Sequence, residues 1–173
     1  MVKKLNTPIT ENKRITLNVG DEVLITGTIY TARDAAHKNL VNAFENNENI
    51  PFDLLDQVIY YVGPTPAKTN QAIGSCGPTS SYRMDKFSPR LMDEGLNVMI
   101  GKGERTLELA KEVKKHKALY LVAIGGIGAL LSKTVIKSEV IAYPELGAEA
   151  IRKLEVVDFP AIVAIDSKGN TIF

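Results

Sequence analysis

At 173 residues, 45% of them hydrophobic, the chain has the size and composition of one globular domain. Its 21 Lys and Arg residues against 20 Asp and Glu residues leave a net charge of +1, which gives no general attraction to nucleic acid or to acidic membranes. Because no apolar run approaches the roughly 20 residues of a membrane-spanning helix and the first residues lack the apolar core of a signal peptide, we expect a soluble, cytoplasmic single domain over residues 1–173.

The first 45 residues predict two strands followed by a helix. Residues 15–17 and 23–30 are rich in Val, Ile and Thr and are separated by a Gly-Asp pair, as in strands joined by a turn. Thr31 and Asp34 have the spacing of a capping box. An apolar residue then recurs at every fourth position, which indicates one buried helix face: Ala36, Leu40 and Phe44.

The start of this predicted helix carries a candidate anion site. Arg33 falls in the first turn, where free backbone amides and the positive end of the helix dipole favour an anion. His37 lies four residues further along the same face. The alternatives are a solvated surface arginine and a structural, hydrogen-bonded histidine.

Residues 63–78 form the longest predicted loop. This loop follows a predicted strand at 58–62, and a short helix from Ser88-Pro89 to Gly95 and a buried strand at 97–100 come after it. Long loops without secondary structure of their own are usually functional or disordered. This one leads into the stretch of the chain that is richest in polar chemistry.

That stretch, residues 74–85 with the sequence GSCGPTSSYRMD, combines hydroxyl groups, an arginine and the only cysteine. Two glycines and a proline allow a tight turn that brings backbone amides close to a ligand. The side chains that can donate to a carboxylate or phosphate are Thr79, Ser80, Ser81 and Arg83. We interpret the stretch as an anion-binding loop; the alternative is a polar surface turn leading into a helix.

Cys76 is the only cysteine, and His37 and His116 are the only histidines. A single cysteine excludes an internal disulfide and suits a reducing compartment. An iron–sulfur cluster is normally held by three or four thiolates and a structural zinc ion by four ligands. The chain therefore cannot hold a cluster alone, and the sequence predicts no metal site. Cys76 is expected to pack; an oxidation-sensitive thiol is the alternative.

Lys102 is a second candidate anchor for an anion. It lies between two glycines at the end of a predicted strand, just before a helix at 107–115 that Thr106 can cap. The alternative is an exposed lysine in a glycine-rich connection. A predicted strand at 119–124 then runs into Gly125-Gly126-Ile127-Gly128, which begins like the dinucleotide-binding pattern GxGxxG but has Leu131 in the third glycine position.

The C-terminal part predicts further strands at 135–143, 154–157, 161–165 and 170–173, with a short helix or turn at 144–150. Alternation of strands and helices in the middle of the chain implies parallel pairing, and closely spaced strands at both ends imply antiparallel pairing. The sequence thus predicts an α/β fold with mixed parallel and antiparallel sheets.

Six segments in this order resemble the β subunit, or C-terminal domain, of class I iron–sulfur fumarases and the related tartrate dehydratases. They are GDEVLITGTIYTARDAAHK (20–38), GPTSSYRMD (77–85), IGKGER (100–105), IGGIGALL (124–131), YPELGAEAI (143–151) and EVVDFPAIVAIDSKGN (155–170). The resemblance implies a three-layer β/β/α "swivelling" domain that closes over a [4Fe-4S] cluster held by a separate α subunit. The limits of the chain resemble those of the two-subunit arrangement.

The family hydrates fumarate reversibly to L-malate, so the resemblance also implies site residues. Substrate binding falls on Arg33, Ser80, Arg83 and Lys102, with Thr79 and Arg83 catalytic. Because a threonine hydroxyl is too weak an acid to ionise unaided near neutral pH, we expect a carboxylate partner for Thr79 from the α subunit. The expected partners are that α subunit and a small dicarboxylate, with homodimerisation of the αβ unit an option. Neither a nucleic acid nor a membrane is expected.

Two positions depart from the family pattern GPTTxGRMD. Ser80 replaces a threonine and keeps the hydroxyl, whereas Tyr82 replaces a glycine with a bulky ring beside Arg83. A non-catalytic assembly module therefore stays open as an alternative. The resemblance also leaves tartrate dehydratase activity open, and the glycine pattern leaves open a nucleotide-dependent enzyme using residues 125–128.

Overall fold

The computed structural model describes residues 2–124 and 128–173. Within these residues a seven-stranded sheet has the order β1-β2-β3-β4-β5-β7-β6. Its strands are β1 (Val2–Asn6), β2 (Glu22–Thr31), β3 (Val58–Tyr60), β4 (Val98–Gly101), β5 (Leu119–Ala123), β6 (Val135–Ala142) and β7 (Ile151–Ile165). The helices are α1 (Glu11–Arg14), α2 (Asp34–Glu45), α3 (Ser88–Asp93), α4 (Leu107–His116) and α5 (Gly128–Ser132), with 3-10 turns η1 (Ser81–Met84) and η2 (Pro144–Glu149).

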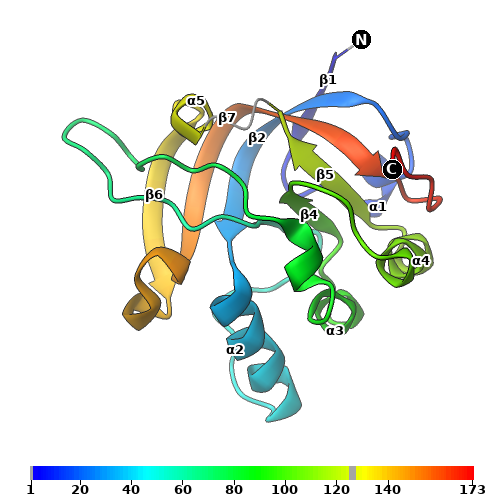
Figure 1. Ribbon diagram of the computed structural model, residues 1–173, viewed down its shortest axis with the longest axis horizontal. Coiled ribbons are helices and arrows are strands. Elements are labelled where there is room, and N and C mark those ends of the chain that lie inside the picture. The colour runs from blue at the N-terminus through cyan, green and yellow to red at the C-terminus, as the bar shows by residue number, and fades with distance from the viewer. Residues whose placement is uncertain (1, 125–127) are drawn as a thin grey trace.

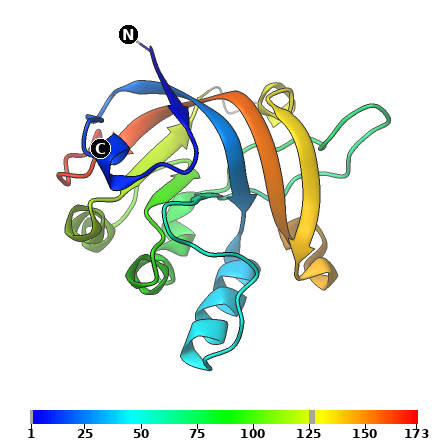
Figure 2. The same cartoon turned by 180° about the vertical axis from the view of Figure 1, so that it is seen from behind.

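The sheet mixes parallel and antiparallel pairs, as the sequence predicts, but the neighbouring strands at the N-terminal end pair in parallel and not antiparallel as expected. Strands β1 to β5 pair in parallel in the order in which they occur, whereas β7 runs antiparallel to β2, β5 and β6. Because β7 pairs with both β2 and β5, the strands β2, β3, β4, β5 and β7 close into a ring (Figure 1). The strongly curved β2, β7 and β6 are seen from behind in Figure 2.

Two hydrophobic cores lie on the two faces of β3, β4 and β5. Alternate residues of these strands, such as Val58 and Ile100, join the apolar residues of β2 and β7 in one core. The residues between them, such as Ile59, Met99 and Tyr120, join those of α2, α3 and α4 in the other. This alternation follows from the period of two in a strand, and it explains why the short strands consist almost entirely of apolar residues. The three helices gather on one side of the sheet (Figure 1).

One prediction near the N-terminus is wrong, and one strand there was not predicted. Residues 15–17 form a turn after α1 rather than a strand, because the amide of Ile15 donates to the carbonyl of Glu11 and extends the helical turn. The strand next to β2 is instead β1, whose polar sequence VKKLN gave no apolar pattern because only Leu5 of this edge strand is buried.

Two predictions near the C-terminus are also corrected. The predicted strands 154–157 and 161–165 are parts of the single strand β7, which continues through Asp158 although this residue has a positive φ of 53°. The amide of Asp158 bonds to the hydroxyl of Thr26 on β2 at 3.0 Å, which ties the bulge to the sheet. Residues 170–173 make only an isolated bridge between Thr171 and Ile165.

Of the helices that the structure describes, none has the length and apolar character to span a membrane.

Candidate functional site

The predicted site residues follow the carboxyl ends of three adjacent parallel strands. Arg33 comes after β2, the loop that leads to Thr79 and Arg83 comes after β3, and Lys102 comes after β4. In α/β sheets ligands bind in the crevice outside the carboxyl ends of the strands. The topology therefore brings together segments that are up to 69 positions apart in the chain (from 33 to 102).

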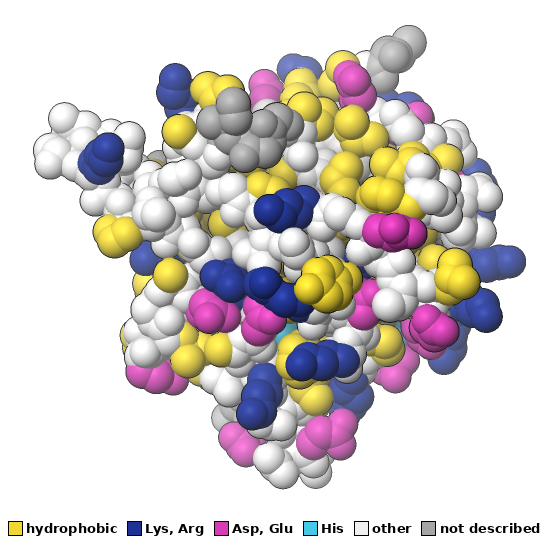
Figure 3. All heavy atoms as spheres, viewed as in Figure 1, with side chains coloured by type: hydrophobic (Ala, Val, Ile, Leu, Met, Phe, Trp, Pro, Cys, Tyr) yellow, Lys and Arg dark blue, Asp and Glu magenta, His cyan; other side chains and the backbone are white. Residues whose placement is uncertain are grey.

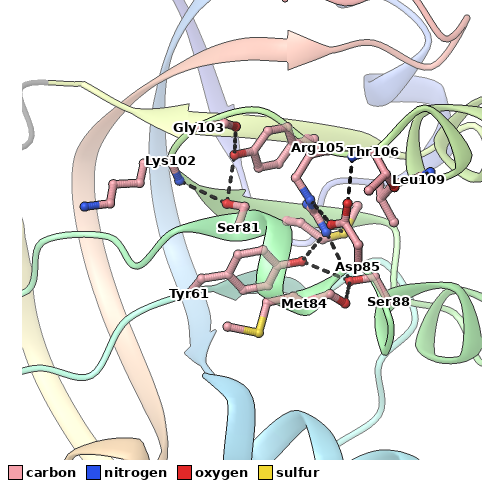
Figure 4. A network of polar contacts seen from close by, with 12 residues as sticks. Tyr61, Ser81, Met84, Asp85, Ser88, Lys102, Gly103, Arg105, Thr106 and Leu109 are labelled. Carbon is pink, nitrogen blue, oxygen red and sulfur yellow. Dashed lines mark hydrogen bonds and ion pairs between the residues drawn. The ribbon is translucent and has the colours of Figure 1, made fainter.

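Backbone hydrogen bonds return the loop from β3 to this edge of the sheet. The amide of Thr79 donates to the carbonyl of Tyr61 at 2.7 Å, and the amide of Ser81 donates to the carbonyl of Lys102 at 3.0 Å. Ser80 and Lys102 form an isolated parallel bridge. Residues 79–81, the hydroxyl motif, are thus neighbours of the predicted lysine. The Lys102 side chain points away from the buried residues drawn in Figure 4.

Buried hydrogen bonds of Ser81 link the loop from β3 to the end of β4 and to β5. The buried Oγ of Ser81 accepts from the amide of Lys102 at 3.0 Å and is linked to the hydroxyl of Tyr120 at 2.8 Å. The approach requires a glycine at the end of β4, because a Cβ on Gly101 would overlap Ser81 Oγ and lie 2.8 Å from the ring of Tyr61. Gly101, the first glycine of IGKG, thus has a packing role. Ser81 supports the site and does not reach a ligand.

Arg33 and Arg83 converge on one carboxylate. Nε and Nη2 of Arg83 donate to the two oxygens of Asp34 at 3.1 and 3.2 Å, and Nε of Arg33 lies 3.8 Å from Oδ1 of the same residue. The Arg33 and Arg83 side chains are 29% and 38% exposed, so a ligand can reach both. A planar guanidinium that binds a carboxylate in this bidentate way fixes its orientation, which a lysine cannot do.

A surface cavity of about 540 Å³ lies beside this ion pair. Its lining residues are Asp34, Tyr82, Arg83, Asp85, Lys86 and Thr106. Tyr82, which is 62% exposed, forms part of its wall without closing the approach to Arg83. Basic and acidic side chains lie side by side in the middle of the face in Figure 3.

The capping box predicted for α2 is wrong. Arg33 rather than Thr31 is the residue that precedes the first helical turn. The Thr31 hydroxyl instead accepts from the amide of Arg152 at 3.0 Å, because Thr31 is still part of β2 and is buried. The prediction that Thr106 caps α4 is confirmed, since its Oγ1 accepts from the amide of Leu109 at 3.2 Å.

His37 is a structural residue, the alternative that the sequence left open. It is fully buried, and its Nδ1 lies 2.8 Å from the carbonyl oxygen of Arg33. Burial lowers the pKa of His37 to about 4, against the smaller opposing effect of that carbonyl. The neutral ring therefore donates its Nδ1 proton to Arg33 and fixes the backbone from which this arginine projects.

We expect NMR titration of the two histidines to give a midpoint near 4 for His37. Because the unfolded chain takes up this proton below pH 6.5, the stability that neutral His37 provides is complete above that pH and is lost as the pH falls toward 4. The loss between pH 7 and pH 5 is about 2 kcal/mol. A His116→Ala variant assigns the two resonances, and a His37 midpoint near 6.5 would show that the ring is hydrated.

Cys76 packs in the core that β2 and β7 share with β3 to β5. Burial raises the pKa of its thiol to about 11, so the reactive thiolate is scarce at neutral pH. Its backbone carbonyl accepts from the buried hydroxyl of Tyr60 at 2.5 Å. With one buried thiol, the donor set of this chain does not fit an iron–sulfur cluster.

Two acidic residues of the site were missed by the sequence analysis. Asp34 holds Arg83, and Asp85 pairs with the buried Arg105 and accepts from the amide of Thr106 at 2.7 Å. Each stands next to or within a segment singled out for its basic or hydroxyl residues, and that position was the only available signal. The predicted glycine pattern at 125–128 includes residues 125–127, which lie outside the described residues.

The chain matches known proteins over almost its whole length. The model of the family described as Fumarase C-terminus matches residues 2–173. "Fumarate hydratase class I, aerobic" of Escherichia coli K12 is 43% identical over 157 residues, which are 90% of this chain and 29% of the relative. "Fumarate hydratase 2" of Leishmania major is 40% identical over 157 residues, 90% of this chain and 28% of the relative.

A third relative is matched over most of its own length. "Putative L(+)-tartrate dehydratase subunit beta" of Methanocaldococcus jannaschii is 40% identical over 163 residues, which are 91% of this chain and 84% of the relative. The chain thus spans less than a third of the two fumarate hydratases but most of this subunit.

Proposed function

We propose that this chain is the β subunit of an iron–sulfur hydro-lyase that adds water reversibly to fumarate to give L-malate, because the chain belongs to the Fumarase C-terminus family. The observation that carries the proposal is the convergence of Arg33 and Arg83 on the carboxylate of Asp34. Two arginines next to one carboxylate, of which Arg83 lines a surface cavity, are suited to bind a carboxylate substrate.

Charge matching supports a dicarboxylate as the ligand. Fumarate and malate carry two negative charges, and Arg33, Arg83 and Lys102 follow the ends of three neighbouring strands. Hydrogen bonds to charged groups contribute roughly 1.5 to 3 kcal/mol each. In this proposal the two arginines orient the substrate, and Ser80 and Lys102 complete the binding of its carboxylates. The carboxylate of Asp34 holds Arg83 in place when no substrate is bound.

The proposed chemical role falls on Thr79. Dehydration of malate removes a proton from the carbon next to one carboxylate and hydroxide from the neighbouring carbon, and hydration reverses both steps. Thr79 is partly exposed, and its amide is fixed to Tyr61. Its hydroxyl needs a carboxylate to accept its proton, and we assign that carboxylate to the α subunit. Positive charge from Arg83 stabilises the electron density that builds on the substrate carboxylate as the proton leaves.

The remaining assignments follow from the same family resemblance. The [4Fe-4S] cluster belongs to the α subunit, since the residues of this chain do not fit it, and this chain is inactive alone. The two cores on either face of β3 to β5 support the three-layer β/β/α arrangement of a single swivelling domain over residues 1–173. Homodimerisation of the αβ unit and the cytoplasmic location stay predictions of the sequence.

Tartrate dehydration is the second candidate function. It is favoured by the relative from Methanocaldococcus jannaschii, which is 40% identical over 163 residues and is named as a putative tartrate dehydratase β subunit. Malate and tartrate differ by one hydroxyl group, and Tyr82 lines the cavity where such a difference can be recognised.

The test is to co-express the chain with a cluster-bearing α chain, reconstitute the pair anaerobically with iron and sulfide, and follow the ultraviolet absorbance of fumarate. Fumarate-dependent loss of absorbance by the pair, and none by either chain alone, is the expected result. Turnover of L-tartrate with no turnover of fumarate would select the second candidate. A fully loaded pair that is inactive on both would leave a non-catalytic assembly module.

A further inference from the structure

A second group of polar residues lies where the last turns of α3 and α4 meet. Asp93 is the last residue of α3, and Glu112 and His116 are four positions apart on α4, so that they share one face of the helix. One ligand atom from each of the three residues can be chosen so that all lie within 4.8 Å of one another. This group is separate from the proposed substrate site, because that site adjoins the opposite end of α4.

The geometry around the imidazole differs from that of a hydrogen-bonded ion pair. Nε2 of His116 lies 3.2 Å from Oδ1 of Asp93 and 3.4 Å from Oε2 of Glu112. Even so, this buried nitrogen has no hydrogen-bond partner within the part of the chain that the structure describes. Neither oxygen therefore lies close to the axis along which the nitrogen points, where a hydrogen bond would place it.

Oxygens displaced from this axis suit a shared metal ion. Ligand atoms about 2.0 to 2.1 Å from one ion are roughly 3.0 to 3.4 Å apart, which matches the two distances from Nε2 of His116. We propose that Asp93, Glu112 and His116 bind a divalent transition-metal ion, Zn²⁺ in the cell, that joins the ends of α3 and α4.

The ligand types select this class of ion. Calcium and magnesium prefer sites made of oxygen alone, whereas one imidazole and two carboxylates suit Zn²⁺ and its spectroscopic substitute Co²⁺. With a neutral imidazole the two carboxylates carry two negative charges, which the ion balances. Three protein ligands leave a coordination position for water.

The expected role of the ion is structural. At the other ends of the two helices, Ser88 lies in the first turn of α3, and Arg105 comes just before Thr106, the residue that precedes α4. The guanidinium of Arg105 donates to the hydroxyl of Ser88 at 3.2 Å. The two helices are thus joined by a buried arginine at one end and by the ion at the other. The proposal is independent of the catalytic function, and its test uses this chain alone.

The test is a Co²⁺ titration of the untagged 173-residue chain after removal of metals with EDTA. We expect a saturable visible absorption band at one ion per chain. His116→Ala and Asp93→Asn, which lie on different helices, should each weaken binding at least about tenfold. Glu108→Gln, which removes an exposed carboxylate of α4 outside the group, should leave the affinity unchanged.

Thermal unfolding supplies the second readout. Zn²⁺ at about 100 times its dissociation constant should raise the melting temperature by roughly 5 to 10 °C, and this rise should disappear in His116→Ala. The proposal fails if Co²⁺ gives no saturable band, or if wild type and both ligand variants bind alike. It also fails if the variants change the melting temperature equally with and without metal, since the group is then an ion pair only.

Discussion

Replacing Arg83 with alanine is expected to lower the turnover of the assembled αβ enzyme by at least about a hundredfold while leaving this chain folded. The contribution of Arg83 to folding is small, because its ion pair with Asp34 is 38% exposed on both sides. Such surface pairs contribute about 1 kcal/mol or less to stability. Its contribution to catalysis is large because an oriented charge acts on the substrate carboxylate as the proton leaves.

Two variants separate these contributions. Lys86→Ala removes another cation that lines the same cavity and should keep most of the activity. Asp34→Asn breaks the same ion pair but keeps the guanidinium available to the substrate, so it should match Arg83→Ala in stability and exceed it in activity. Measured together, kcat, KM and the melting temperature decide the outcome. If Arg83→Ala keeps wild-type activity, the arginine is not part of a working site; if both melting temperature and activity collapse, it is structural.

The parts of the fold that the sequence predicted are those with local signals. The strand at 23–30, the helix with the stripe Ala36, Leu40 and Phe44, and the cap at Thr106 are all confirmed within one or two residues. Each follows from the spacing of apolar residues or from a capping side chain within a few positions. β1 escaped prediction because a polar strand at the edge of a sheet is recognised only by its partner β2.

The sequence predicted the basic and hydroxyl residues of the candidate site, but not the ion pairs that hold these residues in position. Arg33, Arg83 and Lys102 stand out in the sequence because each lies in a loop or next to a helix start. Asp34 pairs with a residue 49 positions away and Arg105 with one 20 positions away, so neither pair has a local pattern. The same holds for Asp93 and His116, whose proximity depends on the packing of α3 against α4.

Arg105 is the charged residue whose loss should most destabilise the fold. Its side chain is fully buried, and its Cζ lies 5.3 Å from the ring centre of Tyr61 and 4.7 Å from that of Tyr120. Figure 4 shows Arg105 with Tyr61 and Asp85. It forms an ion pair with Asp85, whose side chain is only 9% exposed. Burial by itself lowers the pKa of Arg105, but Tyr61, Asp85 and Tyr120 raise it above the ordinary value, so the guanidinium stays charged.

We expect Arg105→Ala to lower the free energy of unfolding by about 3 to 5 kcal/mol, because it leaves the Asp85 carboxylate buried without its partner. Natural domains have only about 5 to 15 kcal/mol of stability, so the variant should unfold at a much lower urea concentration. Since Tyr120 also binds Ser81 beneath the hydroxyl motif, the site should be lost together with the fold.

Arg90 provides the matched control. It also pairs with two carboxylates, those of Glu45 and Glu94, but it is 32% exposed. Arg90→Ala should therefore lower the stability far less than Arg105→Ala. The double variant Arg105→Met with Asp85→Asn removes both buried charges and should recover part of the loss caused by Arg105→Ala. If urea unfolding instead gives equal losses for Arg105→Ala and Arg90→Ala, water reaches the guanidinium, and the buried ion pair does not hold the loop of the site against β4 and β5.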